Sequence, residues 1–235
     1  MTQASARPVA VAPAEVRAGP GVTRALLAGG VVAGPLFVTV VFAQAALRDG
    51  FDFKWHPLSL LSLGGPGWIQ IANFIVTGAL YAGCAVGIRR ALRGGRGGTW
   101  GPRLIGVFGA CLIWAGVFPP DPYEGFPPGT PDGPGHMTWH GLLHSVAPPL
   151  AFLALSVACL VFARRFGKLR EWSWMAGSLA VWLVLASPDL LFGRAWFALA
   201  LALAAAVGWG WASLLAARLM AELRGWQPTE GVERT

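Results

Sequence analysis

Residues 115–145, AGVFPPDPYEGFPPGTPDGPGHMTWHGLLHS, form a polar, proline-rich segment between two long apolar runs. The segment holds three of the four histidines (His136, His140 and His144) and two aspartates (Asp121 and Asp132), but no lysine or arginine. Ionisable groups next to membrane-length apolar runs are expensive unless they face one another, water or a ligand. The segment therefore predicts a functional site at one face of a membrane protein.

The composition predicts an all-α protein embedded in a membrane. Of the 235 residues, 55% are hydrophobic and 12% are charged, whereas about a quarter of the residues of a soluble domain are charged. The net charge of +7 comes from bases clustered between apolar runs, which indicates membrane topology and no nucleic-acid partner. The three cysteines lie inside apolar runs without paired spacing, so they predict neither disulfides nor a metal site.

Six apolar runs predict a six-helix transmembrane bundle, at about residues 25–47, 68–88, 102–118, 137–162, 172–186 and 196–217. We expect residues 22–218 to form this domain, residues 1–21 a disordered cytoplasmic tail and residues 219–235 a second cytoplasmic tail. Fifteen of the 18 lysines and arginines lie in the tails and in the second and fourth loops. The positive-inside rule then predicts a protein of the bacterial inner membrane, with both termini in the cytoplasm and residues 115–145 on the outer side.

Two shorter patterns concern packing. Pro57 can start a short helix over residues 56–63 in the first outer loop, and its leucines predict an interfacial helix, or a lid over the outer ends of the second and fourth spans. The pairs Gly30 with Gly34 and Gly83 with Gly87 each leave a small face on which a neighbouring helix can approach closely.

Polar residues inside the spans predict an outward-facing cavity. Gln70, Asn73 and Thr77 follow helical spacing along one stripe of the second span, Gln44 lies at a similar depth in the first span, and Asp189 ends the fifth. We expect these residues to line a cavity together with Asp121, His140, His144 and His56. The alternative for the stripe is interhelical hydrogen bonding with no ligand.

The histidine spacing leaves two chemical hypotheses open. His140 and His144 are four residues apart, so they share one helical face and can hold one divalent metal ion with a third ligand from elsewhere, such as Asp121, Asp189 or His56. The metal-free hypothesis makes Asp121 a general acid or base with the histidines as its partners.

Three motifs resemble a known family. They are HPLSLLSLGGPGWIQIANF from His56 to Phe74, AGVFPPDP from Ala115 to Pro122 and WHGLLH from Trp139 to His144. In this order they resemble the bacterial and archaeal six-span family called domain of unknown function 998, over roughly residues 26–215. The resemblance implies the six-helix fold and adds weight to His56, Asp121, His140 and His144.

A looser similarity points to a class of substrate. Membrane-embedded hydrolases of the alkaline ceramidase type, whose seventh span this chain lacks, and membrane terpene cyclases act on lipid or prenyl substrates. In the cyclase comparison Asp121 or Glu124 would protonate the substrate inside an aromatic ring that includes Trp114 and Trp139. We therefore predict an intramembrane enzyme for a lipid-like or prenyl substrate, using acid–base or metal-assisted chemistry. The alternative is a non-enzymatic carrier of lipids or small molecules, or a partner of another membrane protein.

Overall fold

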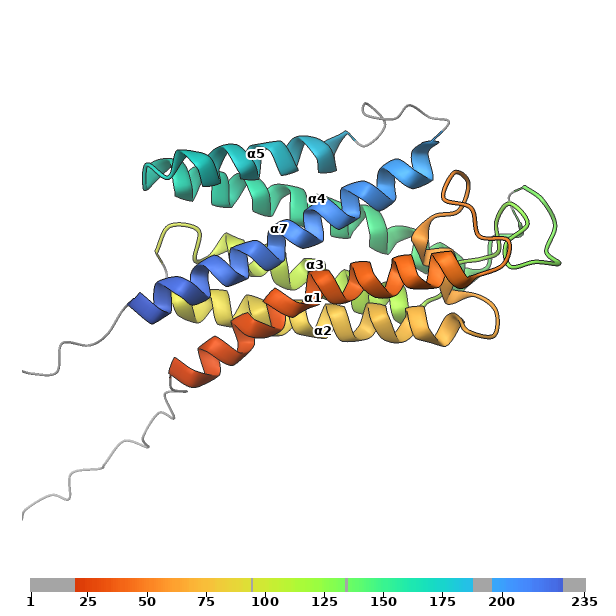
Figure 1. Ribbon diagram of the computed structural model, residues 1–235, viewed down its shortest axis with the longest axis horizontal. Helices are drawn as coiled ribbons and strands as arrows, with labels where there is room; N and C mark the ends of the chain where they lie inside the picture. Colours follow the sequence, from red (N-terminus) through yellow and green to blue (C-terminus); the bar gives the residue numbers. More distant parts are fainter. Residues whose placement is uncertain (1–19, 94, 134, 188–195, 226–235) are drawn as a thin grey trace, which may run out of the picture.

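Six α-helices account for most of the computed structural model, which describes residues 20–93, 95–133, 135–187 and 196–225 (Figure 1). They are α1 (Pro20–Leu47), α2 (Gly67–Leu92), α3 (Trp100–Val117), α4 (Trp139–Lys168), α5 (Trp172–Ala186) and α7 (Phe197–Gly225). Five of them are long and apolar enough to cross a membrane, and α5, with 15 residues, is shorter. The predictions of an all-α fold and of a membrane protein with several transmembrane helices are confirmed.

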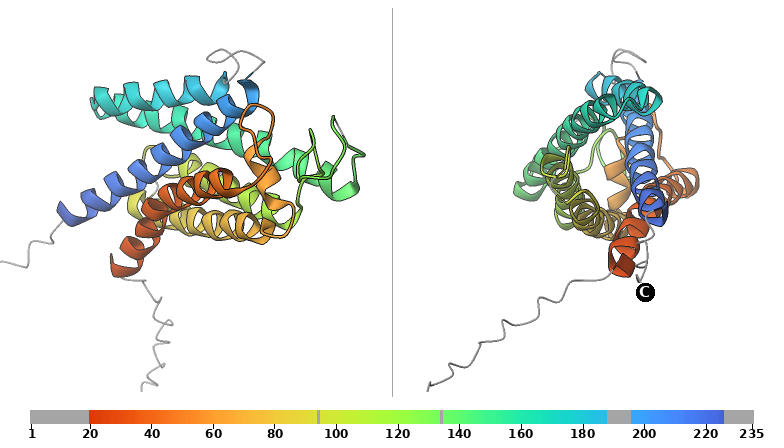
Figure 2. Two further views of the ribbon diagram at one scale, coloured as in Figure 1. Left: turned by 45° about the vertical axis from the view of Figure 1, so that its right-hand side comes forward. Right: turned by 90° about the vertical axis from the view of Figure 1, so that its left-hand side faces the viewer.

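The helices form a ring, which Figure 2 shows in its end-on view. α1 packs on α2 and α7, α3 lies between α2 and α4, and α4 packs on α5, which contacts α7 and closes the ring. α1 and α3 finish at the same end of the bundle at which α2, α4 and α7 begin. All four histidines lie at this end, so we call it the histidine end. The opposite end, where α4 passes into α5, is the arginine end.

Glycines set the closest contacts in this ring. A Cβ atom on Gly78 would lie 2.5 Å from the carbonyl oxygen of Gly109, and one on Gly109 would lie 2.6 Å from that of Gly78. On α1, a Cβ on Gly30 would overlap Cys84, and one on Gly34 would lie 2.6 Å from the Trp209 carbonyl oxygen. The predicted close approach at Gly30 and Gly34 is confirmed.

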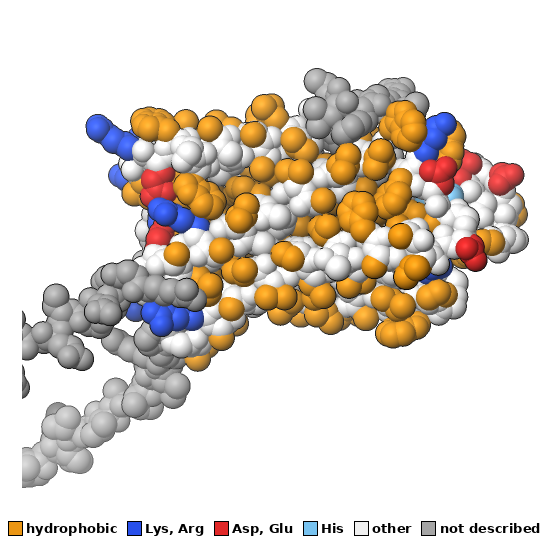
Figure 3. All heavy atoms as spheres, viewed as in Figure 1, with side chains coloured by type: hydrophobic (Ala, Val, Ile, Leu, Met, Phe, Trp, Pro, Cys, Tyr) orange, Lys and Arg blue, Asp and Glu red, His pale blue; other side chains and the backbone are white. Residues whose placement is uncertain are grey.

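The outer surface of the bundle suits lipid as solvent. Large apolar side chains such as Leu153, Leu183 and Leu214 are more than half exposed, which a monomeric soluble protein rarely allows over a wide area. Figure 3 shows hydrophobic side chains across the middle of the molecule and charged side chains gathered at its two ends. The protein is therefore an integral multi-pass membrane protein, and the side on which each end lies stays a prediction of the positive-inside rule.

The short helix expected over residues 56–63 is present as a 3-10 helix, η1 (Leu58–Ser62). Leu60 and Leu61 are buried, and η1 contacts α1 and α2. Residues 1–19 and 226–235, which hold most of the two predicted tails, lie outside the described part of the chain. Helix α7 continues to Gly225, past residue 219 where the second tail was expected to begin.

Candidate functional site

A cavity of about 450 Å³ lies within the histidine end of the ring. Five helices and the start of η1 contribute to its wall, so residues from almost the whole chain meet there. Among the residues that the structure describes, the lining is almost entirely apolar and contains no lysine, arginine, aspartate or glutamate. The lining includes Phe37, Pro57, Leu58, Ser59, His144, Ser145, Pro148, Ala151, Phe152, Ala205 and Trp209.

Trp209 of α7 forms one wall of the cavity by packing against aromatic rings of three other helices. The centroid of its ring lies 5.5 Å from that of Phe37, 4.7 Å from that of Phe108 and 5.7 Å from that of Phe152. Its carbonyl oxygen accepts a hydrogen bond of 2.9 Å from the Tyr81 hydroxyl. Its indole N–H has no hydrogen-bond partner among the described residues.

The start of η1 lines the cavity through Pro57, Leu58 and Ser59. Arg48, just past the end of α1, holds this segment in place by donating hydrogen bonds to the carbonyl oxygens of Leu61 (3.1 Å) and Leu63 (2.5 Å). These contacts satisfy backbone groups that would otherwise be costly near the membrane. η1 therefore forms part of the cavity wall in addition to packing against α1 and α2.

His144 is a buried ionisable side chain of the cavity, with 5% of its surface exposed. Its Nδ1 lies 2.6 Å from the carbonyl oxygen of Phe118 and 3.2 Å from that of Ala115. Carbonyl oxygens only accept hydrogen bonds, so these contacts put the imidazole proton on Nδ1. Nε2 is then an acceptor, and it has no partner among the described residues.

Two prolines add acceptors to the same part of α4. Pro148 and Pro149 lie inside the helix and have no amide hydrogen, so the carbonyl oxygens of His144 and Ser145 receive no helical hydrogen bond from them. Burying such groups is tolerated where they line a cavity. His144, Ser145 and Pro148 are among the residues that line the cavity.

Asp121 is bonded to the start of α4. Its Oδ2 accepts a hydrogen bond of 2.8 Å from the Thr138 amide, and its Oδ1 accepts one of 2.6 Å from the Thr138 hydroxyl. Thr138 is the N-cap of α4 and accepts in turn from the Gly141 amide. A carboxylate at this position also interacts favourably with the helix dipole.

We expect Asp121→Asn to lower the free energy of unfolding by about 1–2 kcal/mol, because an amide cannot accept from both Thr138 donors and carries no charge for the helix N-terminus. Thermal unfolding of the purified protein in detergent measures the loss. Asp132→Asn is the matched control, since Asp132 is an exposed carboxylate of the same loop. Equal unfolding temperatures for the two variants would show that Asp121 does not stabilise α4.

His140 lies beside Asp121 and outside the cavity. Its Nδ1 is 3.9 Å from Asp121 Oδ1 and 2.9 Å from the Thr138 hydroxyl, and its ring packs edge-on against Trp139 at 5.4 Å. Trp139 itself is 70% exposed. Asp121 and His140 are therefore brought together as predicted, but they meet at the helix N-terminus.

His56 joins the two loops of the histidine end. Its Nδ1 accepts a 2.8 Å hydrogen bond from the Asp52 amide, and its Nε2 lies 3.0 Å from the carbonyl oxygen of Glu124 and donates to it. Phe51 and Phe126 pack against the ring at 5.5 and 5.3 Å. With both nitrogens bonded and the side chain buried, this histidine has a structural role.

The polar stripe of α2 is bonded to itself and to α1. Gln44 donates to Gln70 at 2.8 Å, Asn73 donates to the Phe37 carbonyl oxygen and to Gln70 at 3.2 Å each, and Thr77 donates to Asn73 at 3.4 Å. These four residues do not line the cavity described above. The arrangement is an interhelical hydrogen-bond network, the alternative expected for this stripe.

The predicted convergence on one cavity is therefore not what the structure shows. Of the candidate residues that the structure describes, His144 lines the cavity, while Asp121, His140, His56, the α2 stripe and Gln44 are bonded elsewhere. Trp114 packs against Phe118 at 6.3 Å, also outside the cavity lining. The physical reason is that buried polar groups take the nearest partner, here often a backbone carbonyl of another helix. Asp189 lies outside the described residues.

The metal hypothesis finds no ligand set in the described part of the chain, where no three His, Cys, Asp or Glu side chains come together to hold an ion. His140 and His144 share a helical face, but their rings contact different groups.

Sequence reasoning also missed Trp209 and the proline pair of α4. Two consecutive prolines inside an apolar span were the available signal, since they free backbone carbonyls in the middle of a helix.

Comparison with known proteins places this fold in a family. A family model described as "Protein of unknown function (DUF998)" matches residues 31–218, and no curated protein or solved structure matches the chain. The match covers the helices that build the cavity, including the motifs that carry the resemblance noted in the sequence. The chain belongs to the DUF998 family.

Proposed function

We propose that the protein binds a neutral lipid-like or prenyl molecule in the cavity, with an apolar chain among the helices and a hydroxyl group at His144. The observation that carries the proposal is the unpartnered, buried Nε2 of His144 in an apolar cavity. A volume of about 450 Å³ lies within the range of about 300–1,000 Å³ usual for small-molecule sites.

The lining selects against charged ligands. No basic side chain is among the described residues that line the cavity, so a phosphate or carboxylate would lose its hydration without gaining a counter-charge from them. The buried Nε2 of His144, which has no partner among the described residues, calls for a ligand that donates a hydrogen bond. A hydroxyl also accepts, which suits the unpartnered indole N–H of Trp209.

This chemistry favours the carrier hypothesis over the enzyme hypothesis. Catalysis at His144 would use Nε2 as a general base toward the ligand hydroxyl, and Ser59 and Ser145 supply further hydroxyls in the lining. The Ser145 hydroxyl, however, donates to the Leu142 carbonyl oxygen at 2.7 Å. Asp121 and His56 are held in other hydrogen bonds, so among the candidate residues that the structure describes acid–base catalysis would rest on His144.

Binding of three probes with one carbon skeleton tests the proposal: farnesol, the hydrocarbon that keeps its three double bonds and has hydrogen in place of the hydroxyl group, and farnesyl diphosphate. We expect the purified protein to bind farnesol about three- to tenfold more tightly than the hydrocarbon, the difference that one hydrogen bond makes, and not to bind the diphosphate. In His144→Phe the two uncharged probes should bind equally. His140→Phe, changed outside the cavity, should keep the preference.

Two results would contradict the proposal. One is equal binding of the alcohol and the hydrocarbon by the unmodified protein, and the other is an undiminished preference for the alcohol in His144→Phe. Mass spectrometry of the recovered farnesol distinguishes the two hypotheses, since a carrier returns it unchanged and an enzyme returns a product.

A further inference from the structure

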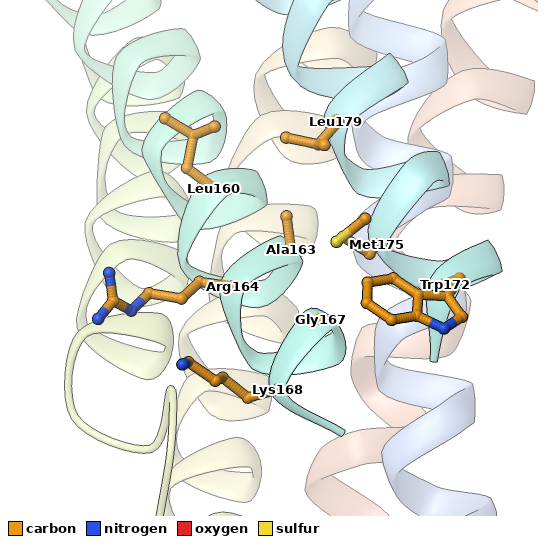
Figure 4. Close-up of a pocket in the computed structure, with 8 residues that line it drawn as sticks. All are labelled: Leu160, Ala163, Arg164, Gly167, Lys168, Trp172, Met175 and Leu179. Carbon is orange, nitrogen blue, oxygen red and sulfur yellow. The ribbon is translucent and has the colours of Figure 1, made fainter. Parts of the chain in front are cut away.

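A second hollow, of about 410 Å³, lies between α4 and α5 at the arginine end, far along the bundle from the first cavity (Figure 4). Ala163 and Gly167 form its α4 wall, and Met175 and Leu179 form its α5 wall. In Figure 4, Met175 and Trp172 point from α5 toward α4. We call this hollow the α4–α5 groove.

Two basic side chains border the groove. Arg164 and Lys168 lie one helical turn apart on α4, and Figure 4 shows both extending from the α4 wall on the side away from α5. Both are exposed, and neither forms an ion pair with another described residue. Side chains of this length cover apolar surface with their stems while the charged ends move freely toward a ligand.

Two other basic residues of this end, Arg218 and Arg165, are paired with glutamates of the protein. Arg218 pairs with Glu171 at 2.9 Å and with Glu222 at 3.3 Å. Arg165 lies 3.7 Å from Glu222 and donates to the carbonyl oxygen of Arg96 at 3.0 Å. Two uncompensated positive charges therefore remain next to an apolar groove.

The position of the groove matches the border between headgroups and hydrocarbon. Trp172, at the start of α5, is 61% exposed, and tryptophan is enriched at this level of a membrane. Below it the walls of the groove are apolar and face the lipid. A ligand that fits has a negatively charged head at the level of Arg164 and Lys168 and an acyl chain below.

We infer that the α4–α5 groove binds an anionic phospholipid, with one acyl chain between Met175 and Ala163 and the negatively charged headgroup at Arg164 and Lys168. Charge complementarity selects the anionic headgroup over a zwitterionic one. The groove and its basic border belong to the same end of the bundle, so the site is the same in either orientation of the protein in the membrane.

Native mass spectrometry of the detergent-purified full chain tests this site. We expect the first adduct with phosphatidylglycerol to form about thirtyfold more tightly than that with phosphatidylcholine of the same chains, as two basic contacts predict. The double variant Arg164→Gln/Lys168→Gln should lose the preference. Arg90→Gln/Arg103→Gln removes the same charge from α2 and α3 and should keep it, since these exposed residues lie outside the groove lining.

Several results would overturn the inference. Equal loss in both double variants would indicate a diffuse effect of net charge, and equal binding of the two lipids would exclude headgroup selection. Competition by glycerol 3-phosphate as strong as that by the intact lipid would show that the acyl chain is not held. A lipid-free dimer of the unmodified protein that dissociates in Arg164→Gln/Lys168→Gln would show that the groove is an interface between copies.

Discussion

Replacing Gly109 with leucine will prevent the bundle from assembling. Gly109 of α3 and Gly78 of α2 lie against each other's backbone, so that a Cβ on Gly109 would sit 2.6 Å from the Gly78 carbonyl oxygen and 2.8 Å from the Ala82 amide nitrogen. Overpacking usually costs about 1–3 kcal/mol because neighbouring side chains can shift. Here the neighbours are backbone atoms, so the two helices must separate and the loss exceeds that range.

The amount of monodisperse protein recovered in detergent and its thermal unfolding measure this effect. Gly177→Leu is the matched control, because a Cβ on Gly177 of α5 would meet nothing within 4 Å. In that exposed helical position leucine is the better helix former by close to 1 kcal/mol. If Gly109→Leu folded as well as Gly177→Leu, the close α2–α3 contact would be wrong.

The helices of this protein could be predicted from sequence because each is a long apolar run with a clear end. Run length and hydropathy report directly on membrane spans, and the fifth span was placed at the residues that α5 occupies, 172–186. Proline and glycine ended the runs in the loops. The glycine pair on α1 was also readable, since two small residues four apart leave one face of a helix bare.

Which polar groups would meet could not be predicted in the same way. His144 bonds to the carbonyl oxygens of Ala115 and Phe118, and Asn73 bonds to that of Phe37. Every residue carries a carbonyl, so the sequence does not mark the ones that will accept a side chain of another helix. Counting polar side chains predicts that they are paired, but it does not predict their partners.

The cavity could not be predicted for a related reason. Its lining comes from five helices and η1, and it includes small residues such as Ala151 and Ala205 beside large ones such as Phe152 and Trp209. Small residues in a span predict close helix packing equally well. Only the tilt of α4 and α7 relative to their neighbours decides which outcome a given alanine produces.

The cavity therefore offers the second prediction, that Ala151→Phe/Ala205→Phe will bind farnesol more than about a hundredfold more weakly than the unmodified protein. Ligands gain most of their affinity from burying their surface in such a site, and two phenyl rings would occupy that space. Both alanines are buried and line the cavity from two different helices, α4 and α7. Folding should be retained, because the rings enter open volume and add contacts there.

Ala180→Phe is the control for added aromatic bulk, since Ala180 is an exposed residue of α5; it should bind farnesol as the unmodified protein does. Thermal unfolding separates a blocked cavity from a damaged bundle, and the single variant Ala205→Phe applies the same test if the double variant unfolds. The prediction differs from that for His144→Phe, which removes only the preference for the alcohol. If the double variant folded and bound farnesol undiminished, the ligand would lie elsewhere and the cavity would be an unused space in the packing of the helices.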